Sequence, residues 1–211
     1  MSLIDLLIKE GWLKTNRIIE SFRKIKRKDF LPDDVKNLAE LNEALPIGFG
    51  QTISQPLTVA FMLEILQPKK GEKILDIGSG SGWTTSLLAQ IVGEKGKVIA
   101  IEIIPELKKL GEKNAEKYNF VKKRIAEFIL DDGSKGYEKE APYDKILASA
   151  SGENLPLAWK KQLKVGGRIV CPIGNSIWLF IKESDNNFEK IEYPGFAFVP
   201  LIQLREDKNN R

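Results

Sequence analysis

The feature that most constrains the fold of this chain is an alternation of strand-like and helix-like segments between residues 73 and 172. Short apolar segments are predicted as strands at residues 73–77, 97–102, 127–130, 144–150 and 168–172. Helical patterns at 83–92, 105–118 and 157–163 lie between them. Strands that are joined through helices form a parallel sheet with helices on both faces. An α/β fold with a mostly parallel, Rossmann-like sheet is therefore expected.

The flanking segments extend this fold. Residues 1–45 carry apolar residues at helical spacing and are predicted to form a helical N-terminal extension to a core at 46–204. Residues 45–54 are expected to be a loop, followed by a helix that begins at Pro56 and is capped by the residues before it. Two strand-like segments after Gly174 indicate an antiparallel hairpin at one edge of the sheet. The chain is expected to form a single domain, 1–211, with a frayed tail at 205–211.

The composition excludes several kinds of chemistry. The 211 residues contain no histidine and one cysteine. Ser-His-Asp and Cys-His nucleophiles, histidine-ligated zinc and an intrachain disulfide are therefore impossible, and no metal site is predicted. No apolar segment approaches the ~20 residues that cross a bilayer, and no signal-peptide pattern opens the chain, so a cytoplasmic protein without a membrane partner is expected.

A basic cluster at 23–28 (RKIKRK) holds five of the chain's 33 basic residues, against 29 acidic ones in total. No aromatic residue is interleaved with these cations, and Asp29 follows directly. We therefore interpret the cluster as a solvated helix face, and nucleic acid is not an expected partner.

The segment 74–82 (ILDIGSGSG) leaves a predicted buried strand and enters a helix. Glycines allow a ligand to approach the backbone at such a turn. Their G-x-G-x-G spacing differs from the G-x-G-x-x-G of dinucleotide enzymes and is the form associated with S-adenosylmethionine. The residues predicted to bind this cofactor here are Asp76, Gly78, Ser79, Gly80, Ser81 and Gly82.

Carboxylates follow the next two predicted strands. Glu102 ends the second strand, where its carboxylate could accept hydrogen bonds from both ribose hydroxyls of a nucleoside. Asp131, Asp132 and Gly133 end the third strand, at the expected position of the adenine. Either carboxylate could accept a hydrogen bond from the exocyclic amine, although the same residues also suit an ordinary turn.

From about Arg27 to Leu201 the sequence resembles the protein-L-isoaspartate O-methyltransferase family. The most diagnostic segment is 45–54 (LPIGFGQTIS), and the glycine turn, 132–134 (DGS), 141–144 (APYD), 163–168 (LKVGGR) and 198–201 (FVPL) also match. The resemblance implies a seven-stranded sheet with an antiparallel last strand. It further implies methyl transfer from S-adenosylmethionine to the free carboxylate of L-isoaspartyl or D-aspartyl residues in damaged proteins, leaving S-adenosylhomocysteine, by a cytosolic and monomeric enzyme.

The resemblance also assigns residues. It makes Ser54 the active-site hydroxyl, adds Thr52 and Ile53 to the cofactor site, and places Ser54, Pro56 and Leu57 at the substrate. The helix that begins at Pro56 could seat an anionic carboxylate on its free amide groups. Ser54 could also act simply as a cap of this helix.

The sequence departs from the family at three positions that bear on substrate recognition. Leu57 replaces a usual histidine, Ala197 a usual arginine, and Ile202 a frequent threonine. Leu57 is expected to lie at the mouth of the carboxylate site, so that one polar contact is missing and the enzyme is weaker. Two alternatives stay open: a class I methyltransferase that acts on RNA or a small molecule, and a non-catalytic protein that binds S-adenosylmethionine.

Overall fold

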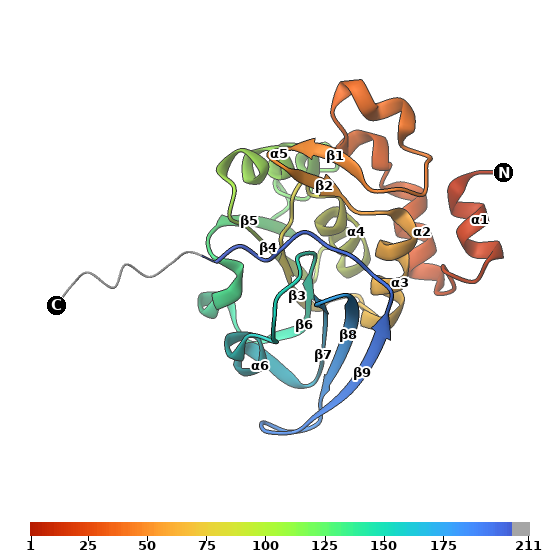
Figure 1. Cartoon of the computed structure of the whole chain (residues 1–211). Helices are drawn as coiled ribbons and strands as arrows, with labels where there is room; N and C mark the ends of the chain where they lie inside the picture. The colour runs from red at the N-terminus through yellow and green to blue at the C-terminus, as the bar shows by residue number, and fades with distance from the viewer. Residues whose placement is uncertain (204–211) are drawn as a thin grey trace.

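The computed structural model describes residues 1–203, so the predicted tail at 205–211 lies outside the described residues. Its main sheet has seven strands in the order β5-β4-β3-β6-β7-β8-β9 (Figure 1). The strands are β3 (Lys73–Ile77), β4 (Lys97–Glu102), β5 (Ala126–Leu130), β6 (Tyr143–Ala148), β7 (Leu163–Ile173), β8 (Ser176–Lys182) and β9 (Phe188–Pro194). Pairs among β3–β7 are parallel, whereas β8 and β9 pair antiparallel. The predicted fold, with its antiparallel C-terminal hairpin, is confirmed.

Helices cover both faces of this sheet. The helices are α1 (Leu3–Lys9), α2 (Asn16–Lys24), α3 (Pro56–Leu66), α4 (Trp83–Val92), α5 (Pro105–Glu116) and α6 (Leu157–Gln162). Neighbouring side chains of a strand point to opposite faces, so β3 directs Ile74 into the core under α3–α5 and Leu75 into the core under α6. Helices α1 and α2 extend the first of these layers, since α2 packs against α4.

Strand order places a ligand site at the carboxyl end of β3, between β4 and β6. The chain leaves β3 on one side to form β4 and β5, then returns to the other side of β3 with β6. Ligands of open α/β sheets bind at such a reversal of strand order. The turn after β3 is tightly packed, because a Cβ added at Gly82 would lie 2.7 Å from the carbonyl oxygen of Gly111 on α5.

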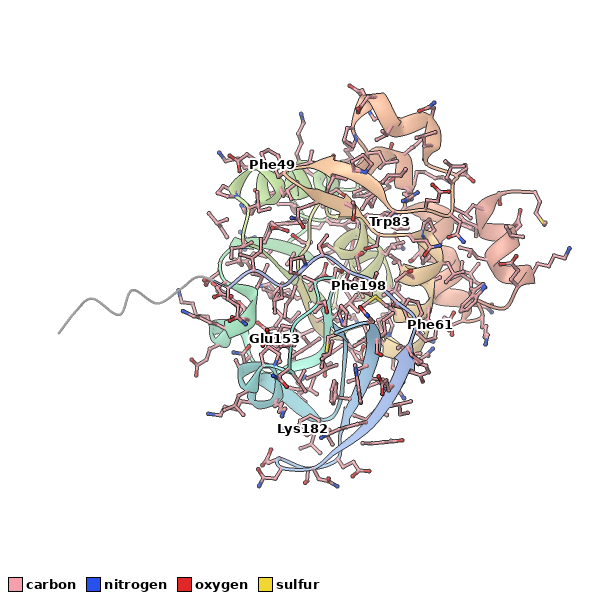
Figure 2. All side chains as sticks on the ribbon, viewed as in Figure 1. Phe49, Phe61, Trp83, Glu153, Lys182 and Phe198 are labelled. Atoms are coloured by element: carbon pink, nitrogen blue, oxygen red, sulfur yellow. The ribbon has the colours of Figure 1, made fainter. Side chains whose placement is uncertain are left out.

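The expected loop at 45–54 is instead an antiparallel hairpin of β1 (Leu45–Gly48) and β2 (Gln51–Ile53). Its buried side chains alternate along the chain, as Leu45 and Ile47 show. Pro46 and the glycines obscured this alternation in the sequence, because both residue types are unfavourable in strands. The tip, 48–50, has three successive positive φ angles, and Phe49 at its centre is 58% exposed (Figure 2).

The basic cluster at 23–28 is not a uniformly solvated helix face. Helix α2 ends at Lys24, and a 3-10 turn, η1 (Arg27–Phe30), follows. Arg27 is only 7% exposed, because its guanidinium donates hydrogen bonds to carbonyl oxygens of the next segment. This part of the prediction was wrong, since the partners that bury Arg27 are backbone groups that a charge pattern does not reveal. Among residues 1–203, no helix is both long and apolar enough to cross a membrane.

Candidate active site

The carboxyl ends of β3 and β4 open into a cavity, here called the glycine-turn cavity. Its lining comprises Ile47, 51–54, 77–81, Trp83, Thr84, 101–104, Leu107, Gly133, Ser149, Ala150 and 199–202. The fold thus brings together most of the predicted site: Thr52, Ile53, Ser54, Gly78, Ser79, Gly80, Ser81, Glu102 and Gly133.

The glycine turn lets the backbone form one wall of this cavity. Gly78 and Gly80 have φ angles of +76° and +51°, a region that glycine adopts without strain. A Cβ added at Gly80 would lie 3.3 Å from the Cδ1 atom of Ile47, so the β1–β2 hairpin lies directly over the turn. Among the described residues, the buried hydroxyl of Ser79 has no hydrogen-bond partner. The wall therefore combines close backbone access with an unsatisfied polar group, which suits a polar ligand.

Glu102 braces this turn. One carboxylate oxygen accepts a hydrogen bond from the Gly80 N–H at 2.8 Å, and the other accepts from Ile103 and Ile104 at 2.9 and 3.0 Å. A carboxylate has about four acceptor sites, of which three are used here. One site on the oxygen facing Gly80 remains for a ligand hydroxyl. Binding both ribose hydroxyls at this carboxylate would require one backbone donor to leave.

Asp76 lies behind the turn and does not line the cavity. Its side chain is fully buried, and one oxygen accepts a hydrogen bond of 2.6 Å from the Thr85 hydroxyl. The other oxygen has no partner among the described residues. Burial raises the pKa of Asp76 to about 7; the hydrogen bond from Thr85 lowers this pKa, and the nearby Glu102 carboxylate raises it. Asp76, like Gly82 at the start of α4, shapes the turn from outside the cavity.

The aspartates after β5 serve their own turn. Asp132 is 1% exposed, and one of its oxygens accepts hydrogen bonds from the N–H and hydroxyl of Ser134. Asp131 accepts a hydrogen bond from the N–H of Asp132. Gly133 lines the cavity, but Asp131 and Asp132 do not. The turn interpretation of these carboxylates thus describes this structure, and their prediction as adenine ligands has no support from the cavity lining.

Ser54 lies where two cavities meet. A second cavity, here called the acceptor groove, adjoins the first, and both are lined by Thr52, Ser54, Ser149 and Val199. The N-cap of α3 is Gln55, and no side chain caps this helix. The interpretation of Ser54 as a simple helix cap was therefore wrong. Among the described residues, the Ser54 hydroxyl has no hydrogen-bond partner, so it is available to a ligand.

Helix α3 begins at Pro56 as predicted, but its first two residues lie outside the lining of both cavities. Pro56 is buried, and neither Pro56 nor Leu57 lines the glycine-turn cavity or the acceptor groove. The N–H of Leu57 donates to the side-chain oxygen of Asn42 at 3.0 Å, and the Leu57 side chain packs against the core. The expectation that Leu57 lies at the mouth of the site was wrong, because Asn42 occupies the amide that would have faced a ligand.

Arg27 is a contributor that sequence reasoning missed. Its guanidinium donates to the carbonyl oxygens of Ser54 at 3.2 Å and Glu43 at 2.6 Å, and it lies 5.5 Å from the ring centroid of Trp83. Burial lowers the pKa of Arg27 to about 10, which still leaves it charged at neutral pH. Since Trp83 also lines the glycine-turn cavity, Arg27 connects two of its walls. One arginine in a basic run gave no signal of this role.

The segment 195–203, here called the C-terminal strap, crosses the carboxyl ends of the strands and covers the site (Figure 1). The N–H of Ser151 donates to the carbonyl oxygen of Val199, and the N–H of Leu201 donates to that of Ser151, both at 2.8 Å. Through Phe198 and Val199 the strap lines the acceptor groove (Figure 2). Two of the three family departures, Ala197 and Ile202, lie on this strap, each lining one of the two cavities.

Strand order, the glycine turn after β3 and the carboxylate at the end of β4 form the ligand site of a Rossmann-like fold, and the G-x-G-x-G spacing of the turn is the form of class I methyltransferases. Within this class, residues 1–206 match the model of the family described as protein-L-isoaspartate(D-aspartate) O-methyltransferase. The chain belongs to this family.

Individual proteins of this family are similar to the chain in sequence and in structure. A protein-L-isoaspartate O-methyltransferase of Methanopyrus kandleri is 40% identical over 204 residues, which cover 95% of this chain and 89% of the relative. Protein-L-isoaspartate O-methyltransferase 2 of Archaeoglobus fulgidus is 44% identical and covers 89% of this chain and 85% of its own length. A solved protein-L-isoaspartate O-methyltransferase superposes with a TM-score of 0.85 at 27% identity, over 94% of this chain and 64% of that one. A Plasmodium falciparum structure described by the same name, in complex with S-adenosyl-L-homocysteine, shares the fold with a TM-score of 0.84 at 22% identity, over 95% of this chain and 96% of that one.

Replacing Asp76 by asparagine should remove part of the pH dependence of stability. The pKa of Asp76 is about 7 in the folded protein and near 3.8 in the unfolded chain, so the folded protein holds the proton more tightly. Its contribution therefore favours folding at low pH and is lost as the pH rises from about 4 to about 7. Urea unfolding between pH 5 and pH 8 should show Asp76→Asn gaining stability relative to the parent as the pH rises. Parallel profiles of the two proteins would contradict the assignment.

Proposed function

We propose that this chain methylates the free carboxylate of L-isoaspartyl or D-aspartyl residues in damaged proteins, with S-adenosyl-L-methionine as the methyl donor. The observation that carries the proposal is the position of Ser54 between the glycine-turn cavity and the acceptor groove. A transferase needs two ligands to meet at one point while each has its own binding surface. The two cavities provide these surfaces, and family membership supports the donor and the acceptor.

The glycine-turn cavity suits S-adenosylmethionine on the evidence of its own residues. Gly78 and Gly80 leave the backbone accessible, the Ser79 hydroxyl is unsatisfied, and Glu102 retains one acceptor site for a ribose hydroxyl. Apolar side chains of Ile101 and Leu107 complete the lining and can contact an adenine ring. We infer that Thr52 and Ile53 bound the same ligand from the β1–β2 hairpin. When bound, the cofactor supplies a methyl group on a positively charged sulfonium.

The chemistry requires no general base, which fits a chain without histidine. The acceptor carboxylate has a pKa near ~4, so it is already ionised at pH 7. The Ser54 hydroxyl donates a hydrogen bond to one carboxylate oxygen and thereby orients the other toward the methyl group. An oxygen–carbon bond forms as the sulfur–carbon bond breaks. The negative carboxylate and the positive sulfonium become a neutral methyl ester and neutral S-adenosylhomocysteine, so no proton has to move.

We further infer a monomeric, single-domain enzyme that works in the cytoplasm and does not bind nucleic acid. The supporting features are the near balance of 33 basic and 29 acidic residues and the burial of Arg27, which leaves the basic cluster at 23–28 less continuous. Basic patches that bind nucleic acid are continuous and usually carry aromatic residues. Sedimentation equilibrium of the purified chain measures its oligomeric state directly.

The function is tested by incubating the purified chain with S-adenosylmethionine labelled in its methyl group. An isoaspartyl peptide, its aspartyl twin and a structured RNA serve as acceptors. Label in the isoaspartyl peptide alone supports the proposal. Transfer to RNA would instead indicate a methyltransferase of different specificity, and cofactor binding without any transfer would indicate a non-catalytic relative.

Gly80→Val should abolish cofactor binding. Valine would place a branched side chain where the turn now admits the ligand and would collide with Ile47. Gly93→Val is the matched control, since Gly93 has a similar φ of +65° but faces open space at the end of α4, away from the cavity. In both variants a valine must adopt a positive φ, which costs backbone strain. The difference between their affinities for S-adenosylhomocysteine, measured by calorimetric titration, therefore reports the effect on the site. Equal affinity in the two variants would remove the cofactor from this cavity.

Ser54→Ala should lower kcat/KM for an isoaspartyl peptide by roughly tenfold to a hundredfold, because a hydrogen bond to a charged group contributes about 1.5–3 kcal/mol. The affinity for S-adenosylhomocysteine should stay the same. Since the hydroxyl has no partner among the described residues, stability should change by no more than about 0.5 kcal/mol. Ser54→Thr keeps a hydroxyl and should retain more activity than Ser54→Ala. Full activity of Ser54→Ala would show that another group holds the carboxylate.

A further inference from the structure

The acceptor groove has an unusual composition for a protein-binding surface. None of the described residues that line it carries a charge. Hydroxyl groups of Thr52, Ser54, Thr58 and Ser149 lie along one part of the lining. The remainder is mainly apolar and comes from the C-terminal strap, with Phe196, Ala197, Phe198 and Val199. Because charged side chains make up 29% of the whole chain, their absence from this groove gives it a distinct chemical character.

The apolar part of the groove is held in place by packing. The Phe196 ring stacks on Phe61 of α3, with centroids 5.4 Å apart and an interplanar angle of 10°. Phe61 in turn meets the edge of Tyr193 on β9 at 5.0 Å. The two backbone hydrogen bonds to Ser151 fix the strap on its other side, so this surface is preformed.

Ser54 relates the groove to the reacting group. An acceptor carboxylate at Ser54 lies where the groove meets the glycine-turn cavity. The rest of the groove must then receive the part of the substrate to which this carboxylate is attached. In a protein substrate, that is the chain next to the modified residue. A charged neighbour would lose water on entering and would meet no opposite charge, whereas an apolar or aromatic neighbour would bury its surface against Phe196 and Phe198.

We infer that the acceptor groove is a specificity subsite that selects an apolar or aromatic residue next to the methylated one and disfavours a charged residue of either sign. This inference rests on the proposed function. Ala197 is the position chosen for a test, because this short, exposed residue lines the groove.

A panel of isoaspartyl peptides tests the inference on the parent protein. The residue before or after the isoaspartyl residue is varied among Phe, Leu, Ser, Glu and Lys, and kcat/KM is measured for each peptide. At one of the two flanks, Phe and Leu should exceed both Glu and Lys by about tenfold. Values within twofold at both flanks would overturn the inference while leaving the proposed function intact. Absence of methylation in every isoaspartyl peptide, with the cofactor bound, would instead overturn the proposed function.

Ala197→Lys moves the preference in a defined direction. A cation in the groove should favour the Glu-flanked peptide over the Lys-flanked one, shifting the ratio of their kcat/KM values by about tenfold. Val165→Lys is the matched control, because Val165 is 59% exposed on β7 and lines neither cavity. It adds the same charge to the protein and should leave the ratio within twofold of the parent. An equal shift in both variants would reflect net charge only and would overturn the assignment of Ala197, and so would no shift in a folded Ala197→Lys.

Discussion

The site depends first on one buried cation. Arg27 donates hydrogen bonds to the carbonyl oxygens of residues 39, 41, 43 and 54, and its guanidinium stacks near Trp83. A charge without such partners would be very costly to bury, so these four carbonyls can hardly move apart while the protein stays folded. The N-terminal segment is therefore part of the active-site framework, because Arg27 holds the backbone of Ser54 in place.

Two neighbouring acidic residues show how environment separates roles. Glu102 is surrounded by backbone N–H groups, which satisfy most of its acceptor sites and draw the glycine turn against the end of β4. Asp76 has a single hydroxyl donor and lies in the apolar interior, where burial raises its pKa to about 7. The same chemical group thus serves as a hydrogen-bond acceptor that braces the turn in one position and as a buried group that is partly protonated at neutral pH in the other.

The sequence was sufficient for features that are encoded locally. The strand–helix alternation, the glycine turn and the position of Glu102 follow from periodicity and spacing over short distances. Features that depend on distant partners could not be predicted. The burial of Arg27 depends on carbonyls up to 27 residues away, and the N–H of Leu57 is taken by Asn42 from 15 residues earlier. The β1–β2 hairpin was missed because its strands are only four and three residues long and β1 contains a proline and a glycine.

The backbone conformation at the tip of the β1–β2 hairpin determines which substitutions the tip tolerates. Gly48, Phe49 and Gly50 all have positive φ angles, but a Cβ added at either glycine would meet no atom within 4 Å. Space is therefore not limiting, and each substitution at a glycine costs only the backbone strain of about 1–2 kcal/mol. Phe49 already bears that strain with its side chain in solvent. Other side chains can therefore replace Phe49 with little further strain, whereas substitution of either glycine would add that strain, so the surface chemistry of this turn can change at Phe49 without altering the fold.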